Sequence, residues 1–268
     1  MIPRSYLFVP ADRPERIAKA LGSGADTVIV DLEDALAPTA KDAARETLRA
    51  WLHAAAPGVG VVVRINGADT PWFDGDLALC AAASVAAVLL PKAGQDGDLA
   101  TVRRALPDKP IIALVETAEG FDRLRDIARA PGVVRLAFGT IDFRLDLGLG
   151  DDDAALLPFG ARFVLESRLA QLAPPIDGVT TSVDDVERVA RDVERARRLG
   201  FGAKLCIHPR QVDVGNRSLS PSAAELDWAQ RVVDAMVSAG GAAVAVDGKM
   251  VDRPVLLRAE ALLRQRRG

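Results

Sequence analysis

The feature that most constrains this chain is an eightfold alternation of short apolar runs with stretches of helical spacing. The runs are continuously apolar, which is typical of strands buried on both faces in a parallel sheet covered by helices. Eight such units predict a closed (β/α)8 TIM barrel rather than an open sheet, and 268 residues suit one barrel. The expected strands span residues 5–9, 27–30, 59–64, 87–90, 110–115, 134–138, 176–179 and 203–207.

The alternation stops in the last fifth of the chain. A helical stretch there is followed by two short apolar runs around Asp247 and Gly248, which is the signal of a β-hairpin, and then by a final helical stretch. We therefore predict a barrel core over residues 1–217. Residues 218–268 are expected to form the last barrel helix and a C-terminal hairpin-plus-helix appendage, a segment able to cover the site of a neighbouring subunit.

Local signals predict where several helices begin and end. Pro14 suits the first turn of one helix, and Thr39 is a suitable N-cap for the next. A later helix is expected to begin at Ser182, with acids in its first turn, and to end at Gly200 after a run of arginines.

Composition excludes several classes of function. The net charge is -3, and the arginines alternate with acids along helices, so no basic surface for nucleic acid is expected. No apolar run approaches the roughly 20 residues of a membrane span, and the N-terminus lacks a signal-peptide pattern, which favours a cytoplasmic protein. The two cysteines lie far apart and provide neither a disulfide framework nor a thiolate metal site. With only two histidines, zinc sites built on His clusters and Ser-His-Asp relays are poorly supplied. Carboxylates are the better candidates for chemistry.

Two acids follow neighbouring expected strands. Glu116 ends the run "IIALVE", and Asp142 follows the run "LAFGTI". Parallel strand ends meet at one rim of a barrel, and Mg²⁺ prefers one or two carboxylates with water and substrate oxygens. We therefore expect Glu116 and Asp142 to bind a divalent cation. The alternative is that each acid caps the helix that follows it.

A guanidinium and three acids occupy the ends of two further strands. Arg64 ends a wholly apolar run, and its planar fork of donors suits the carboxylate of a substrate. An ion pair with Asp31 or Glu33 on the adjacent strand is the other interpretation, and both can hold together. The motif "VDLEDA" also carries Asp34, and these three acids are expected to support the site by holding Arg64, Lys92 or metal-bound water rather than as direct ligands.

Three further positions belong to the same rim. Lys92 ends the fourth strand, where it could form a Schiff base, although a fixed positive charge paired with an acid fits this acidic rim better. Gly139 and Thr140 precede Asp142, where a small residue permits close approach of a substrate. His208 ends the eighth strand and is expected to be a hydrogen-bonded rim residue.

Longer motifs along the chain include "VIVDLEDALAP", "VRINGADTPWFDGDL", "VLLPKA", "LVETAEG", "LAFGTIDFRLDLG", "GFGAKLCIHPRQV" and "VDGKMVDRP". Together they resemble the citrate lyase beta-subunit-like (CitE-like) proteins of the HpcH/HpaI aldolase and malyl-CoA lyase group. The resemblance runs in order from about residue 4 to residue 262. It departs at Ala11 and Asp12, where the family commonly has glycine and asparagine.

The resemblance implies a (β/α)8 barrel that binds Mg²⁺ through Glu116 and Asp142. It also implies that Arg64 binds the carboxylate and carbonyl end of a small keto or hydroxy acid. An aspartate in a motif like "MVDRP" reaches the site of the adjacent subunit in related lyases, and here that residue is Asp252. Trimers, or hexamers built from trimers, are the assemblies that the resemblance implies.

The leading functional hypothesis is a Mg²⁺-dependent carbon–carbon lyase of the Claisen or aldol type. Its substrate would be a short hydroxyacyl thioester, with CoA favoured over an acyl carrier protein, and its products would be a keto acid and an acetyl-CoA-like thioester. The alternatives are a class II aldolase acting on free hydroxy-keto acids, a thioester hydrolase, and a non-catalytic subunit of a lyase complex.

Overall fold

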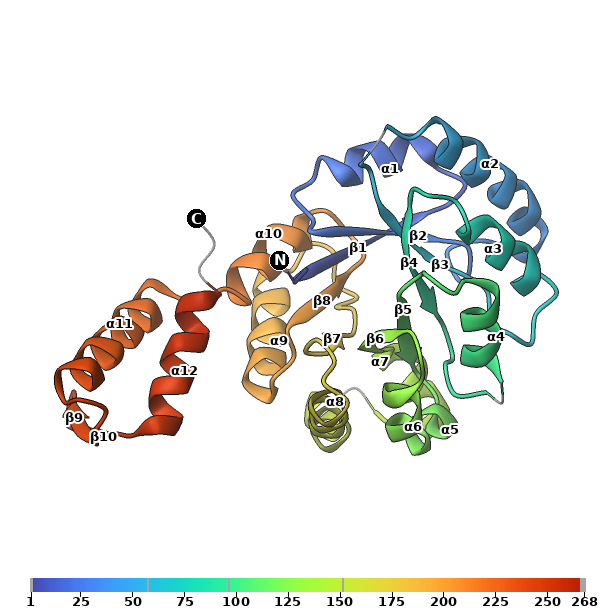
Figure 1. Ribbon diagram of the computed structural model, residues 1–268. Coiled ribbons are helices and arrows are strands. Elements are labelled where there is room, and N and C mark those ends of the chain that lie inside the picture. Colours follow the sequence, from blue (N-terminus) through green and yellow to red (C-terminus); the bar gives the residue numbers. More distant parts are fainter. Residues whose placement is uncertain (1, 57, 96, 151, 266–268) are drawn as a thin grey trace. The chain divides into compact units, whose positions relative to one another are not determined.

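The computed structural model describes residues 2–56, 58–95, 97–150 and 152–265. In this part of the chain, eight parallel strands close into a barrel in sequence order, and the last strand pairs back to the first. Figure 1 shows the helices surrounding these strands. The predicted (β/α)8 barrel is confirmed. The strands are β1 (Ser5–Pro10), β2 (Thr27–Asp31), β3 (Val61–Arg64), β4 (Val85–Leu90), β5 (Ile111–Val115), β6 (Val133–Phe138), β7 (Ile176–Asp177) and β8 (Ala203–Cys206).

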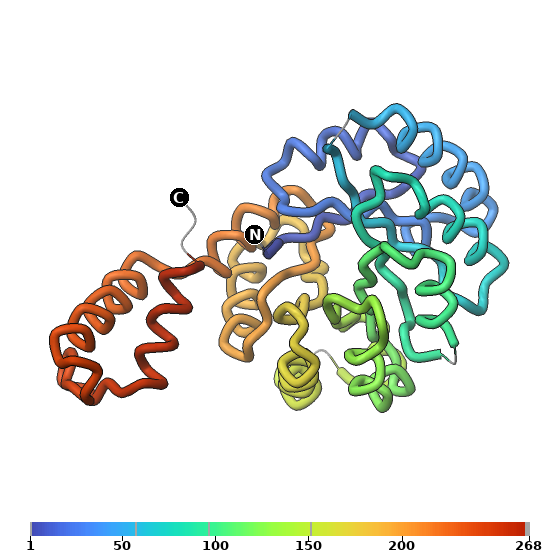
Figure 2. The backbone as a smooth tube through the Cα atoms, in the orientation of Figure 1, coloured from blue at the N-terminus to red at the C-terminus, as the bar shows by residue number. Residues whose placement is uncertain are grey.

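Helices connect successive strands along the backbone, which Figure 2 traces from one end to the other. Two short 3-10 helices, η1 (Pro38–Ala40) and η2 (Asp153–Leu156), precede two of the α-helices. The α-helices of the barrel are α1 (Pro14–Leu21), α2 (Lys41–Ala54), α3 (Phe73–Cys80), α4 (Asp98–Ala105), α5 (Ala118–Asp122), α6 (Leu124–Arg129), α7 (Thr140–Leu147), α8 (Leu157–Leu169), α9 (Val186–Leu199) and α10 (Arg210–Ser218).

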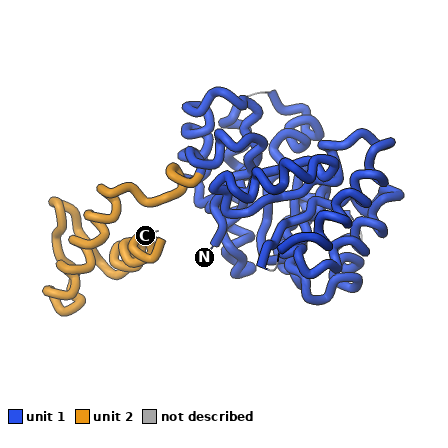
Figure 3. Tube along the Cα trace, turned by 90° about the horizontal axis from the view of Figure 1, so that it is seen from above, with its two compact units in different colours: residues 1–215 blue, residues 216–268 orange. Residues whose placement is uncertain are grey.

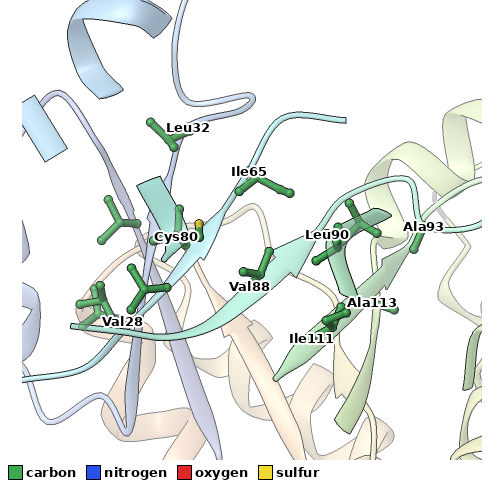
Figure 4. Close-up of a cluster of buried hydrophobic side chains, with 14 of the residues drawn as sticks. Val28, Leu32, Ile65, Cys80, Val88, Leu90, Ala93, Ile111 and Ala113 are labelled. Carbon is green, nitrogen blue, oxygen red and sulfur yellow. The ribbon is translucent and has the colours of Figure 1, made fainter. Parts of the chain in front are cut away.

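The strands are buried on both faces. Tyr6, Leu89 and Leu205 belong to a cluster inside the barrel, whereas Val88 and Leu90 belong to the larger cluster between strands and helices, part of which Figure 4 shows. Successive side chains of a barrel strand point alternately inward and outward. Both sides are apolar, which explains why the strands appear in the sequence as continuous apolar runs.

The helix boundaries agree with the sequence only in part. Pro14 opens α1 and Gly200 ends α9 in a left-handed conformation, as expected. The prediction that α9 begins at Ser182 was wrong, because Asp185 is the N-cap and its carboxylate accepts the backbone N–H of Arg188. The prediction for Thr39 was also wrong. It lies inside η1, and the residue preceding α2 makes no side-chain capping bond.

The chain forms two compact units, Met1–Gly215 and Asn216–Gly268, which Figure 3 colours separately. The smaller unit contains α11 (Ala223–Ser238), an antiparallel hairpin of β9 (Val244–Val246) and β10 (Lys249–Val251), and α12 (Arg253–Arg264). Asp247 and Gly248 have φ values of 51° and 73°, the left-handed conformation that a two-residue hairpin turn requires. The predicted hairpin-plus-helix appendage is therefore confirmed. None of the helices described is long and apolar enough to cross a membrane.

Candidate metal and acid-binding site

A cavity of about 390 Å³ lies at the carboxyl ends of the strands, and most of the predicted site residues line it. Its lining includes Asp31, Arg64, Glu116, Thr140 and Asp142. Asp34 and Gly139 also line it, together with apolar side chains such as Phe8, Leu114, Val179 and Leu205. The remaining predicted positions on the barrel lie close by, since Glu33 contacts Arg64 and Lys92 contacts Glu33. The barrel topology thus brings these residues together from the ends of five strands, β2 to β6.

Arg64 is held by acids on the adjacent strand. It is the last residue of β3 and is paired in register with Asp31 of β2. Its Nε and Nη2 donate to the two oxygens of Asp31 at 2.7 and 2.6 Å, its Nη1 lies 3.0 Å from Glu33, and its guanidinium lies 4.9 Å from the ring centre of Phe8. Burial acts to lower the pKa of Arg64, but the Asp31 and Glu33 carboxylates outweigh it and raise that pKa. The arginine is therefore a fixed positive charge with a defined orientation.

Lys92 also forms an ion pair, with its Nζ lying 3.2 Å from Glu33 Oε1. Burial acts to lower the pKa of Lys92, but Glu33 and the neighbouring acids raise it above its ordinary value. A lysine that forms a Schiff base needs a lowered pKa. The geometry therefore favours the fixed positive charge over the Schiff base.

Glu116 follows β5 directly and is 2% exposed. Its Oε1 accepts the backbone N–H of Lys92 at 2.9 Å, and Lys92 has a φ of 48°, a left-handed conformation that costs a non-glycine residue free energy. Thr117, not Glu116, caps α5 through a bond from the backbone N–H of Gly120. The helix-cap alternative therefore does not apply to Glu116.

Asp142 lies in the first turn of α7, four residues beyond the end of β6, rather than at the strand end itself. It is partly exposed and lines the cavity, and no side chain caps α7 at Gly139. Burial is the main cause that raises the pKa of Glu116 well above its ordinary value, and the negative charges of Glu33 and Asp142 add to it. The negative charge of Asp142 is therefore close enough to Glu116 to disfavour ionisation of the buried carboxyl group.

The donor set fits a hard divalent cation. Mg²⁺ takes oxygen ligands and often uses only one or two carboxylates, with water and substrate oxygens completing an octahedron. A cation at this place would offset the unfavourable proximity of the buried Glu116 and the Asp142 carboxylate. The described residues contain no group of three or more His, Cys, Asp or Glu side chains placed to hold a metal. A cation here would thus depend on Glu116, Asp142 and small-molecule oxygens.

Gly139 makes room for Glu116. A Cβ added at Gly139 would lie 2.4 Å from both Cβ and Oε2 of Glu116, far inside any normal contact. Gly178 has the same relation to Thr140, whose Oγ1 would lie 2.2 Å from an added Cβ. The sequence indicated a small residue at Gly139 for the approach of a substrate, whereas in the structure it permits the close packing of Glu116. The role of Gly178 was not predicted.

Replacing Gly139 with alanine is expected to displace the Glu116 carboxylate and lower Mg²⁺ affinity by about 10–100-fold, the usual effect of disturbing a ligand's support. Isothermal titration with Mg²⁺ measures the change. Gly215→Ala is the control, because a Cβ there meets nothing within 4 Å. Equal Mg²⁺ affinities for the two variants would contradict this account of Gly139.

Two other charged groups were not predicted. Lys204 of β8 is buried, and its Nζ lies 2.7 Å from Asp177. The presence of a lysine in the otherwise apolar run "KLCI" was the feature of the sequence that could have indicated this buried ion pair. A second cavity of about 410 Å³ includes this pair and several arginines of α9. Those arginines are engaged by carboxylates, since Arg188 and Arg195 both contact Asp153 and Asp192. The predicted site residues converge on the strand-end cavity instead.

Asp252 belongs to the smaller unit. It is the N-cap of α12, and its Oδ1 accepts the backbone N–H of Val255 at 3.3 Å. The side chain is partly buried rather than enclosed. Helix capping accounts for an aspartate at this position, and any chemical role must be compatible with that bond.

A family model described as HpcH/HpaI aldolase/citrate lyase matches residues 4–209. The chain belongs to this family. The resemblance that the sequence motifs indicated is thereby confirmed, and the family's citrate lyase beta-like branch is represented among the relatives of the chain.

Two curated relatives match the chain along nearly its whole length. The citrate lyase subunit beta-like protein of Mycobacterium tuberculosis is 37% identical over 268 residues, which cover 97% of this chain and 94% of the relative. The (3S)-malyl-CoA thioesterase of Cereibacter sphaeroides is 35% identical over 271 residues, which cover 97% of this chain and 95% of the relative.

Solved structures of similar proteins share the fold. The crystal structure of CitE from Mycobacterium tuberculosis in complex with magnesium, acetoacetate and coenzyme A has a TM-score of 0.86 and 36% identity, covering 98% of this chain and 97% of that chain. The same protein in complex with magnesium and pyruvate has a TM-score of 0.78 and 32% identity, covering 98% of both chains.

Proposed function

We propose that this protein is a Mg²⁺-dependent carbon–carbon lyase that acts on a short hydroxyacyl thioester, with CoA as the thiol carrier. The observation that carries the proposal is the convergence of Glu116 and Asp142 on one cavity beside Arg64. The CitE structure with magnesium, acetoacetate and coenzyme A supports it, because that protein is similar along almost the whole chain.

In this proposal each polar group has one task. Glu116 and Asp142 hold Mg²⁺, which when bound supplies Lewis-acid stabilisation of charge on a substrate oxygen. Arg64 binds the carboxylate end of the acid, and because Asp31 fixes its orientation, little reorganisation is needed during reaction. Thr140 lines the same cavity, and in this proposal it would contact the acid from the side of α7.

In the cleavage direction, a base removes the hydroxyl proton of the substrate, the carbon–carbon bond breaks, and a keto acid and a thioester enolate form. We propose that Asp252 of a second copy of the chain moves the proton to the α-carbon of that enolate, and removes it again in the condensation direction. The active assembly would then be a homo-oligomer, with a trimer as the expected form.

A thioester hydrolase is the second candidate. It is favoured by the (3S)-malyl-CoA thioesterase of Cereibacter sphaeroides, which aligns with 97% of this chain. Hydrolysis would use the same cavity and the same Arg64 anchor, with water attacking the thioester carbonyl and the CoA thiol leaving.

Malyl-CoA distinguishes the candidates in one assay with Mg²⁺. Cleavage produces glyoxylate and acetyl-CoA without releasing a thiol, whereas hydrolysis produces malate and free CoA. A complementary screen pairs acetyl-CoA and propionyl-CoA with glyoxylate, pyruvate and oxaloacetate in the condensation direction. Formation of a carbon–carbon bond in any pair supports the lyase. Release of free CoA with no carbon–carbon bond formed or broken in either assay overturns it in favour of the hydrolase. Turnover of free hydroxy-keto acids, with no affinity for any CoA ester, would indicate a class II aldolase.

A further inference from the structure

A buried polar network lies beside the cavity without lining it. Lys41 of α2, Asn66 after β3 and Asp76 of α3 are 7%, 1% and 0% exposed. Arg45 of α2 binds the outer side of this network through a 2.7 Å bond from its Nε to Asp76 Oδ1. Buried charges are retained in proteins only where they are paired and hydrogen-bonded, so such a network needs a structural or functional reason.

Asn66 is the centre of the network. Its backbone N–H and its Nδ2 both donate to Asp76 Oδ2, at 3.0 and 2.7 Å. Its Oδ1 accepts a bond from Lys41 Nζ, which lies 5.0 Å from the ring centre of Trp72. The amide is therefore fixed on both sides, and so is the segment that directly follows Arg64.

The same two side chains bind the segment that follows β2. Asn66 Nδ2 donates to the carbonyl oxygen of Leu32 at 2.9 Å, and Lys41 Nζ donates to the carbonyl oxygen of Glu33 at 3.0 Å. Residues 32–36 form neither helix nor strand. Backbone bonds hold them only in part, from the Leu32 N–H to the Arg64 carbonyl oxygen at 3.0 Å and from the Leu36 N–H to the Glu33 carbonyl oxygen at 3.2 Å, and the side-chain bonds add to these. Lys41 and Asn66 thus connect the strand end that carries Glu33 to the strand end that carries Arg64.

Asp31 and Glu33 connect this network to the site. Asp31 accepts the backbone N–H of Glu33 at 2.9 Å and binds Arg64 through both of its oxygens. The Glu33 carboxylate contacts Arg64 and Lys92, whose backbone N–H binds Glu116. A shift of the Glu33 backbone would therefore be transmitted to the orientation of Arg64.

We propose that Lys41 and Asn66 are positioning residues that set the orientation of Arg64 by fixing the carbonyl groups of Leu32 and Glu33. The consequence for binding rests on the proposed function, in which Arg64 anchors the carboxylate of the acid. The effect on Arg64 itself does not depend on that function.

Lys41→Met removes the charge and the donors while keeping a long apolar side chain, and Arg45→Met is the matched control. Arg45 lies on the same helix and in the same network, but its described bonds go to Asp76 and Asp42 and not to the β2 segment. A purely structural role for the network predicts that both variants lose thermal stability and nothing more. The positioning role predicts that only Lys41→Met alters Arg64.

The direct readout is the solvent-exchange rate of the Arg64 Nε–H, followed by ¹⁵N nuclear magnetic resonance and assigned by its absence in Arg64→Lys. We expect exchange to be roughly tenfold faster or more in Lys41→Met, because the Nε–H bond to Asp31 loosens, and unchanged in Arg45→Met. In the presence of Mg²⁺, pyruvate affinity should fall by about 10–100-fold in Lys41→Met only, while affinity for Mg²⁺ alone stays as in the parent protein.

Unchanged Arg64 exchange in Lys41→Met, or an equal change in Arg45→Met, overturns the inference. If the parent protein itself does not bind pyruvate, the proposed function fails, and the exchange comparison still decides the role of Lys41. If Lys41→Met does not fold, Lys41→Gln, which removes the charge and shortens the side chain but keeps an amide NH₂ group, is subjected to the same comparison.

Discussion

Replacing Glu116 with glutamine is expected to abolish measurable Mg²⁺ binding and to lower turnover by roughly a thousandfold, the size of effect that loss of several kcal/mol of Lewis-acid stabilisation produces. The variant keeps the shape of the side chain and the acceptor for the Lys92 N–H, so only the negative charge is lost. Isothermal titration with Mg²⁺ and the malyl-CoA assay are the measurements. Removing the metal from the parent protein with a chelator should reproduce the loss of turnover, and added Mg²⁺ should restore it.

The burial of Glu116 also predicts how the substitution affects the stability of the fold. Because burial raises the pKa of this carboxyl group, an uncharged amide at the same place should leave the fold intact or slightly more stable. Glu119→Gln, three residues away on the exposed side of α5, is the control and should retain Mg²⁺ binding. Normal turnover and normal Mg²⁺ affinity in Glu116→Gln would refute the assignment of Glu116 as a metal ligand.

The second large effect is expected at Asp252, where two substitutions separate chemistry from structure. Asparagine caps helices about as well as aspartate, so Asp252→Asn should keep α12 and its stability, whereas Asp252→Ala should cost about 1 kcal/mol. Both variants should lose about 10²–10⁴-fold in turnover, the range for removal of a general acid or base, with Mg²⁺ affinity unchanged. Steady-state kinetics, Mg²⁺ titration and thermal unfolding report the three quantities.

The pattern across the two variants is decisive for Asp252. Full turnover in Asp252→Asn would mean that the carboxylate serves only as a helix cap. Mixing Asp252→Asn with Glu116→Gln then tests the proposed second copy. If one chain supplies Asp252 to the cavity of another, mixed oligomers regain activity that neither variant has alone.

The fold was largely predictable because its signal is local. Eight continuous apolar runs define eight strands, and the turn residues Asp247 and Gly248 mark the hairpin. β7 is shorter than the predicted run. Ile176 is its single pairing with β6, Asp177 pairs with Lys204 of β8, and the strand ends before Gly178, which packs against Thr140. Helix starts were less predictable, because several polar residues near a boundary can each serve as a cap and only tertiary position selects one.

The candidate site was predictable in its residue types but not in its supporting contacts. Acids and a guanidinium at strand ends stand out against apolar runs, so Glu116 and Arg64 were apparent from the sequence. The bonds from Lys41 to Asn66 and from Asn66 to Asp76 join positions 25 and 10 residues apart, and nothing local in the sequence indicates which polar residues will meet. The close packing of Gly139 on Glu116 depends on the register of β5 and β6, which no short motif encodes.

The mouth of the barrel carries a formal excess of negative charge. In the part of the chain described, the carboxylates of Asp31, Glu33, Asp34, Glu116 and Asp142 face only Arg64 and Lys92 as basic partners. An acidic small molecule arriving first would meet net repulsion there, whereas a dication would be attracted. The electrostatics therefore favour ordered binding, in which the dication binds before the organic acid. Prior entry of the dication would thus make the pocket selective for anions that can share its coordination sphere.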